Sequence, residues 1–344
     1  MQKKEITIYD IAEKLGVSAS TVSRALNGGA LTKKSTTLKI CSTAELMGYR
    51  NNSFASKLRT QRSNTIGIIV PRLNSYFMSE VIAGIEKLTN EAGYDLLISQ
   101  SMEDGEKQLR NIKTMFNSRV DGLLVSLSPE GKGVSNFDIF LERKIPVLFF
   151  DRVPLNQGVP TVTIDNEMGG YLVTKHLIER GARKIVHLGG NQQVSVYKER
   201  ANGYKRAILE NGFHFKEEDL MINDLSEQAG IAAAHMIAKK GVDGVFAAND
   251  NCAASCMNEL KRLGIKIPTQ VVFAGFNNDM ISRNVDPPLT TINYPGFDMG
   301  RVAAAKLLDH LAGRFDMDTA PLVTIKSDLV VRGSSLAQDI FFNT

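Results

Sequence analysis

The chain has 344 residues, of which 43% are hydrophobic and 23% charged, and its mean hydropathy is −0.11. This balance is typical of a soluble globular protein and excludes collagen-like and disordered classes, and the length suffices for two or three domains. No apolar run approaches the roughly 20 residues that span a bilayer. The segment Met1–Glu5 leads into an amphipathic pattern and not into an export signal. We therefore expect a cytoplasmic protein without membrane attachment.

Positive charge is concentrated at the amino-terminal end. Residues 1–62 hold 11 lysines and arginines against 4 acidic residues, a net charge of +7. The remaining residues hold 30 against 33, a net charge of −3. Such asymmetry is the electrostatic footprint of a phosphate-binding module, although charge alone does not distinguish it from a solvated basic face.

The first 49 residues form a helical pattern without strands. Thr7 is placed to cap a helix Ile8–Leu15, Gly16 permits a tight turn, and Ser18 can cap a second helix, Ala19–Leu26. Two short helices joined by a glycine-containing turn form a helix-turn-helix, whose second helix lies in the major groove of DNA.

A third helix, about Thr36–Met47, would complete the small core of this headpiece, residues 1–49. The early exposed positions of the second helix are small or hydroxylic, with one arginine, so they can approach base edges and phosphates closely. The alternative is a helical packing module without DNA function, which the charge asymmetry disfavours. The candidate DNA-contacting side chains of the headpiece are Thr7, Ser18, Ala19, Ser20, Thr21, Ser23, Arg24 and Asn27.

Beyond residue 63 the chain alternates short β-rich runs with helical ones. This alternation indicates βαβ units, and two series of similar spacing predict two doubly wound parallel-sheet subdomains. Strands are expected to begin at Ile66, Asp95, Gly122 and Pro146, and in the second series at Lys184, Leu220, Gly244 and Val271. Helices are expected at Met78–Ala92, Glu167–Arg180, Arg200–Asn211 and Asn251–Leu263.

The chain is expected to pass between the subdomains near Thr161–Asp165, Leu289–Ile292 and the strand-like Leu322–Val331. The N-subdomain then comprises about 63–163 and 294–322, and the C-subdomain about 164–293 and 323–344. Three linking segments would act as a hinge around a cleft.

Polar side chains at the carboxyl ends of these strands are candidate ligand contacts, because open α/β sheets bind ligands there. Carboxylate and amide groups bind vicinal hydroxyls and aromatic rings pack on sugar C–H faces, so the set suits a polyhydroxylated ligand. Any single member could be an ordinary loop or cap residue. The candidate effector-binding residues are Asn74, Tyr76, Phe77, Ser126, Asp151, Arg200 (expected to begin its helix), Asn249 and Asn277.

Specific runs of the sequence match a known family at fixed spacing. The runs Tyr9-Asp10-Ile11-Ala12-Glu13, Gly16-Val17-Ser18 and Thr21-Val22-Ser23-Arg24-Ala25-Leu26-Asn27 resemble the headpiece of the lactose/galactose repressor family of bacterial transcription regulators. The resemblance continues through Ser63-Asn64-Thr65-Ile66-Gly67 and covers essentially the whole chain. It implies an all-α headpiece with a hinge helix, joined to a periplasmic-binding-protein-like α/β core.

The resemblance assigns residues 50–62 to a hinge helix that folds only on operator DNA, whereas the residues alone would also suit a flexible linker. Asn52 and Ala55 would contact DNA, and Leu58 stands where the family's leucine wedge enters the minor groove, an insertion that unstacks a base step. Asn51 replaces the proline usual before this hinge.

At the effector end, the resemblance covers Asn74–Phe77, Asp151, Arg200 and Asn249, which match effector-contacting positions. Asn277 replaces the ligand-binding aspartate of a Gly-Phe-Asp motif, and Tyr294 stands where glutamine is common. The ligand's identity therefore does not transfer from the family.

We accordingly predict a sequence-specific DNA-binding regulator, a repressor of carbohydrate-utilisation genes that is controlled by a small sugar-like effector and binds a pseudo-palindromic operator as a homodimer. The alternatives are a regulator that responds to a purine or other metabolite and a sugar-binding protein without DNA function. No nucleotide-binding, hydrolase or metal motif is present, so neither catalysis nor a cofactor or metal is expected. The spacing of Cys252 and Cys256 favours buried reduced thiols. Too few residues follow Arg332 for an added tetramerisation helix.

Overall fold

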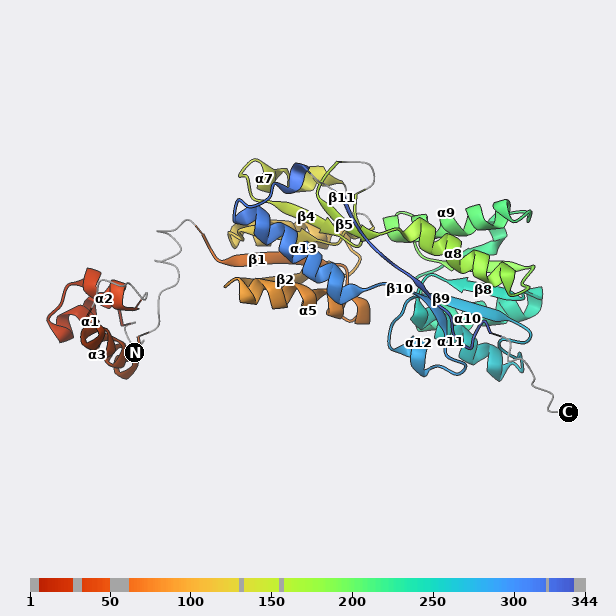
Figure 1. The fold of residues 1–344 in the computed structure, drawn as a ribbon, viewed down its shortest axis with the longest axis horizontal. Coiled ribbons are helices and arrows are strands. Elements are labelled where there is room, and N and C mark those ends of the chain that lie inside the picture. The colour runs from red at the N-terminus through yellow and green to blue at the C-terminus, as the bar shows by residue number, and fades with distance from the viewer. Residues whose placement is uncertain are drawn as a thin grey trace. The chain divides into compact units, whose positions relative to one another are not determined.

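The computed structural model describes residues 6–26, 33–49, 62–129, 133–154, 158–319 and 322–336 (Figure 1). The chain divides into two compact units. Met1–Arg62 contains the headpiece, and Ser63–Thr344 is called the core below. Within the described residues, no helix has both the length and the apolar character to cross a membrane.

The headpiece contains three helices, α1 (Ile8–Leu15), α2 (Ala19–Leu26) and α3 (Lys34–Met47). A capping box starts α1, because the backbone N–H of Thr7 donates to the Asp10 carboxylate over 2.7 Å while the Thr7 hydroxyl accepts from the Asp10 N–H. The left-handed Gly16 (φ +64°) then ends it. The fully buried side chains Ile11, Val22 and Ile40, one from each helix, form the core of this unit.

The first lobe of the core is built on a parallel sheet in the order β11-β5-β4-β3-β1-β2. Its inner strands are nearly continuous runs of buried residues, unlike the edge strands β2 and β11, because helices cover both faces. The strands are β1 (Thr65–Val70), β2 (Asp95–Gln100), β3 (Gly122–Val125), β4 (Val147–Phe150), β5 (Thr161–Ile164) and β11 (Leu322–Ile325). The helices are α5 (Tyr76–Glu91), α6 (Gly105–Asn117), α7 (Asp138–Leu141) and α13 (Gly296–Leu311), with short 3₁₀ turns at Val134–Phe137 and Met317–Thr319.

The second lobe repeats this plan in the strand order β12-β10-β9-β8-β6-β7, in which only the β10–β12 pair is antiparallel among the described strands. The strands are β6 (Ile185–Gly189), β7 (Leu220–Ile222), β8 (Gly244–Ala247), β9 (Val272–Asn277), β10 (Thr290–Asn293) and β12 (Leu329–Val330). The helices are α8 (Asn166–Glu179), α9 (Ser195–Glu210), α10 (Glu227–Lys240), α11 (Asp250–Arg262) and α12 (Ile281–Asn284), with a 3₁₀ turn at Glu217–Asp219. Cys252 and Cys256 of α11 are buried free thiols, as predicted.

Within the described residues, the chain passes between the lobes after β5, after β10 and after β11 (Figure 1). The predicted single strand Leu322–Val331 is in fact two short strands in two different sheets. Because β11 pairs with β5 as far as Ile325, the first lobe extends beyond the predicted end at residue 322. Three linking segments thus join the lobes.

Glycines allow one helix pair in each lobe to pack with backbones in close approach. A Cβ atom on Gly170 of α8 would lie 2.3 Å from the Arg200 carbonyl oxygen of α9. In the other lobe, a Cβ on Gly300 of α13 would lie 2.0 Å from the Val81 carbonyl oxygen of α5. Any larger side chain at these points would push the helices apart, so the position of the Arg200 backbone is fixed by packing.

Candidate functional site

The exposed face of the headpiece is formed by the start of α2. The Ser18 hydroxyl lies 2.9 Å from the Ser20 hydroxyl and 2.8 Å from that of Thr21, while the Arg24 Nε donates to the Ser20 carbonyl over 3.2 Å. Ser20 and Arg24 are exposed. Their small size and positive charge suit close approach to phosphates and base edges.

The other predicted DNA contacts are less open or lie elsewhere. Ala19, Thr21 and Ser23 are half-buried, and the exposed Thr7 is engaged in the cap of α1. Asn27, Asn52, Ala55 and Leu58 lie outside the described residues, and their roles stay predictions.

A cleft of about 350 Å³ lies between the two lobes of the core. It lies beyond the carboxyl ends of the strands, where polar side chains from both lobes converge. Six of the eight predicted effector residues line it: Asn74, Phe77, Asp151, Arg200, Asn249 and Asn277.

Tyr76 and Ser126 are not among the lining residues. Tyr76 is the first residue of α5 and 43% of its surface is exposed. Ser126 is fully buried and its hydroxyl donates to the Asp151 carboxylate over 3.0 Å. Ser126 therefore supports a cleft residue from behind, a role that its position at the end of a strand does not distinguish from direct ligand contact.

Asp151 uses both of its carboxylate oxygens within the protein. Oδ1 accepts a hydrogen bond of 2.8 Å from the Tyr294 hydroxyl, and Oδ2 accepts from Ser126. The Tyr294 ring stacks on Phe77 with ring centroids 4.2 Å apart. Burial, with Asp151 adding to it, raises the pKa of Tyr294 well above its usual value, so the phenol stays a hydrogen-bond donor.

Arg200 is the buried cation of the cleft, with 2% of its surface exposed. Its Nε donates to Asn166 over 3.0 Å and its Nη1 to the Ala248 carbonyl over 2.7 Å, while the guanidinium lies 3.6 Å from the ring centroid of Phe276. Burial lowers the pKa of Arg200. Among the described residues, Nη2 has no hydrogen-bond partner. The expectation that Arg200 begins its helix was wrong, since α9 starts at Ser195 and places Arg200 in its second turn.

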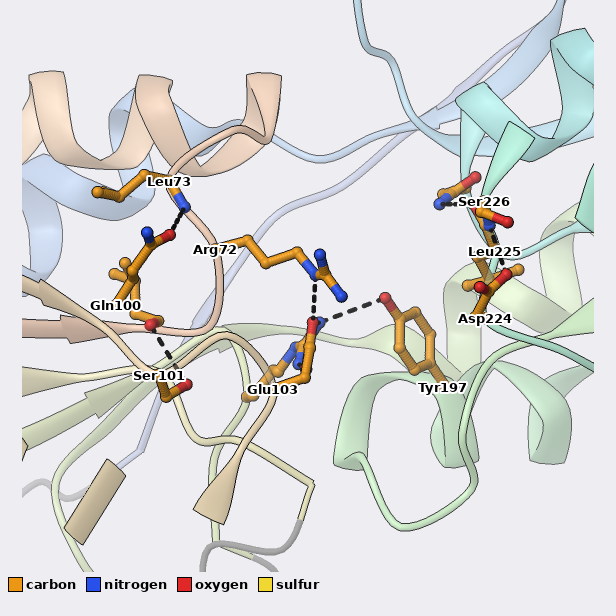
Figure 2. A network of polar contacts seen from close by, with 12 residues as sticks. Arg72, Leu73, Gln100, Ser101, Glu103, Tyr197, Asp224, Leu225 and Ser226 are labelled. Carbon is orange, nitrogen blue, oxygen red and sulfur yellow. Dashed lines mark hydrogen bonds and ion pairs between the residues drawn. The ribbon is translucent and has the colours of Figure 1, made fainter. Parts of the chain in front are cut away.

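The mouth of the cleft is bridged by a charged network (Figure 2). Arg152 donates to the Glu103 carboxylate through Nη1 (2.5 Å) and Nη2 (3.1 Å), and Arg72 Nε reaches Glu103 over 3.3 Å. Arg152 Nη2 also lies 3.5 Å from the hydroxyl of Tyr197, which belongs to the opposite lobe. A backbone bond of 3.1 Å from Val153 to the Ser195 hydroxyl adds a second link. These contacts hold the two lobes together beside the cleft.

Sequence reasoning missed several charged lining residues, of which Asp279 is the most buried. Only 5% of Asp279 is exposed, and one oxygen of its carboxylate accepts from the Asn277 side chain over 3.3 Å. Burial raises the pKa of Asp279 to about 6. It lies two residues beyond the end of β9, so the strand-end rule does not single it out. Other lining residues that were missed include Arg72, Glu103, Tyr197 and Asp224.

Asn249 lines the cleft but has a structural role as well. Its side-chain oxygen caps α11 by accepting from the Cys252 N–H over 2.8 Å, and its Nδ2 donates to the Leu225 carbonyl over 3.2 Å. What remains for a ligand is one amide hydrogen and the second lone pair of the side-chain oxygen.

A helix-turn-helix headpiece followed by a two-lobed core with a polar cleft defines a ligand-controlled, DNA-binding regulator. Residues 7–52 match the family described as bacterial regulatory proteins, lacI family, and residues 174–335 match the periplasmic binding protein-like domain. The transcriptional repressor PurR of Vibrio atlanticus (strain LGP32) is 32% identical, over 89% of this chain and 92% of its own. The chain belongs to the lacI family and is a DNA-binding transcription regulator; its relatives are regulators, not enzymes.

Solved structures agree in fold. A complex of the regulator CelR with cellobiose matches with a TM-score of 0.71 and 26% identity, over 96% of this chain and 100% of that one. The lac repressor dimer bound to operator matches with a TM-score of 0.84 over 97% of this chain and 100% of that one, at 23% identity, a likeness that concerns the fold alone.

Proposed function

We propose that this chain is a repressor whose binding to operator DNA is controlled by a sugar-like effector held in the cleft between the lobes. The observation that carries this is the buried Arg200, which faces a cleft lined by amide and carboxylate groups and by the rings of Phe77 and Tyr294. Such a set can exchange hydrogen bonds with several hydroxyls and pack on an apolar sugar face. The cellobiose complex of CelR supports the same ligand class.

We infer that the repressor binds DNA as a symmetric dimer through the core. Both sheets end in an edge strand that carries an exposed isoleucine: Ile98 of β2 is 38% exposed and Ile222 of β7 is 50% exposed. Exposed apolar side chains on edge strands favour pairing with another chain. Other exposed apolar residues of the core include Leu73, Met102 and Met280. The dimeric lac repressor on its operator offers a parallel.

Effector control would follow from a change in the relation of the two lobes. The links at the mouth, Arg152–Tyr197 and Val153–Ser195, must rearrange if the cleft opens. An effector can shift such an equilibrium only by its differential affinity for the two states, typically about 1–3 kcal/mol of coupling.

The test begins by selecting a preferred DNA sequence with the full-length chain from random duplexes. Fluorescence anisotropy then measures its affinity in the presence of neutral sugars, sugar phosphates, sugar acids and purines. We expect one neutral sugar to change the DNA affinity by about 5- to 150-fold. Arg24→Ala should weaken DNA binding by about 1–3 kcal/mol without changing the affinity for that sugar. Operator binding that responds only to a purine, or to no compound, would overturn the proposed effector class.

A further inference from the structure

The two sides of the cleft floor differ in which polar atoms they leave for a ligand. Among the described residues, the open groups on the second-lobe side are Arg200 Nη2, one carboxylate oxygen of Asp279 and the side-chain oxygen of Asn277. On the first-lobe side, Asp151 has both oxygens occupied by Tyr294 and Ser126. Of these two carboxylates, Asp279 is therefore the one that has an oxygen with no hydrogen bond from the described residues.

The turn after β9 explains why Asp279, and not residue 277, presents a carboxylate. Asn277 and Asn278 both have left-handed backbones, with φ of +116° and +58°. Asparagine tolerates this region better than most residues, so two in succession allow a sharp reversal of the chain. The reversal brings residue 279 back to the cleft.

Hydrogen bonds then hold this turn on three sides. The Asp279 N–H donates to the Asp250 carboxylate over 2.8 Å, and the Asp279 carbonyl accepts from the Ser282 N–H and hydroxyl. The Asn278 side chain accepts from Arg332 over 2.6 Å and donates to Asn293 over 3.0 Å. The Asp279 carboxylate is thus held on a rigid support, which is what a recognition group requires.

We propose that Asp279 selects the ligand by accepting, through its open carboxylate oxygen, a hydrogen bond from one hydroxyl of a neutral polyhydroxylated molecule, while Arg200 donates to the adjacent hydroxyl. This inference rests on the proposed function and specifies the ligand class of the same cleft. The open oxygen of the carboxylate takes one O–H donor and the guanidinium supplies an N–H to the neighbouring oxygen, which matches a vicinal diol. Both side chains line the same cleft, and the two groups interact electrostatically.

The same arrangement disfavours anionic ligands at the floor. Asp279 and Asp151 are 5% exposed and both interact with Arg200, so two carboxylates already face its guanidinium. The other arginine that interacts with Asp151, Arg152, is paired with Glu103 at the mouth. A phosphate or carboxylate placed there would meet repulsion with little water to screen it. The ligand end that reaches the floor is therefore uncharged.

The experiment is calorimetric titration of the full-length chain without DNA. The probes are ribose, glucose, galactose and cellobiose as neutral sugars, glucose 6-phosphate and gluconate as anions, and hypoxanthine and guanine as purines. Asp279→Asn keeps the size of the side chain and an acceptor for Asn277 but removes the charge. The matched control is Asp309→Asn, on α13, where Asp309 forms an exposed ion pair with Arg314.

We expect at least one neutral sugar to bind, Asp279→Asn to weaken it about 10- to 100-fold, and Asp309→Asn to stay within about two-fold. Asp279→Ser serves as a second variant, and thermal unfolding checks that each variant folds. An affinity in either folded variant within two-fold of the unchanged chain overturns the inference, as does binding of only anions or purines, or of none of the probes. A sugar that binds through Asp279 but leaves operator affinity unchanged would overturn the proposed function alone.

Discussion

The two sides of the cleft contrast in how their polar groups are used. On the first-lobe side, Asp151 is bonded to Tyr294 and Ser126, and Arg152 is bonded to Glu103. On the second-lobe side, Arg200 and Asp279 each keep a polar atom without a protein partner among the described residues. On the first-lobe side, the polar groups are hydrogen-bonded within the protein. On the second-lobe side, polar groups are held in place but keep an atom that a ligand can bind.

This contrast indicates a division of labour between closure and recognition. A buried polar group that already has its hydrogen bonds gains little from a ligand, but it is costly to disrupt. An available group on a rigid support contributes directly to affinity and selectivity. We therefore expect substitutions on the second-lobe side to change ligand affinity and those on the first-lobe side to change stability or coupling.

The largest effect is expected from Arg200→Ala. It removes the buried guanidinium and its Nη2 donor, and charge-assisted hydrogen bonds contribute about 1.5–3 kcal/mol each. Calorimetry should show a loss of sugar affinity of about 100-fold or more, while operator affinity measured without sugar is retained. Arg200→Lys should also bind weakly, because an ammonium cannot reproduce the fork of donors. Retained sugar response in the alanine variant would remove Arg200 from the ligand site.

The next effect is a dependence of sugar affinity on pH. Burial raises the pKa of Asp279 to about 6, so its carboxylate is charged above that pH and becomes neutral below it. If the charged form accepts the ligand's hydroxyl, affinity is full above pH 6 and falls about tenfold per pH unit below it. Titrations between pH 5 and 8 measure this, and Asp279→Asn should flatten the profile. An equal fall in that variant would assign the titration to another group.

Tyr294→Phe tests the first-lobe side. It leaves the buried Asp151 carboxylate with Ser126 as its remaining hydroxyl donor, which should lower the free energy of unfolding by about 1–3 kcal/mol. Sugar affinity should change by less than about fivefold, because both oxygens of Asp151 already accept hydrogen bonds within the protein. Urea unfolding and calorimetry give the two quantities. Tyr76→Phe, at the exposed start of α5, is the control. A large loss of sugar affinity without a loss of stability would show that the first-lobe side also binds the ligand, contrary to the proposed division.

The smallest effect is expected from Glu103→Gln at the mouth of the cleft. The pair with Arg152 is partly exposed, with 26% of the Glu103 side chain accessible, so its contribution is about 0.2–1 kcal/mol. Sugar affinity should change by about fivefold or less. Glu179→Gln, at a surface pair with Lys175, should have no measurable effect. A change above tenfold would move Glu103 from closure to recognition.

Local sequence signals predicted most of the fold. Helices α1 and α2 have the predicted bounds, because a cap and a turn glycine mark the two ends of α1 and Ser18 caps the start of α2. The start of α9 was missed because its N-cap position, Val194, makes no side-chain capping bond. The segment Leu322–Val331 resembles one strand in sequence, yet tertiary pairing divides it between two sheets.

The site was harder to predict than the fold. A position at the end of a strand does not show which way the side chain points or whether its polar atoms already have hydrogen-bond partners. Ser126 and Asp151 both follow strands, but Ser126 points behind the cleft and bonds to Asp151. Asp279 carried no signal, since its place depends on two successive left-handed asparagines that no periodicity reveals. Whether a polar atom is already bonded is a tertiary property, so it becomes visible only in the folded chain.

The three linking segments have a consequence for protein engineering. The second lobe is made of a long continuous segment from α8 to β10 together with the distant strand β12, which adds to the sheet beside β10. A chimera that exchanges only the continuous segment would separate β10 from the strand that evolved beside it. Grafting a new ligand specificity onto this regulator therefore requires the small β12 strand to be transplanted with the lobe.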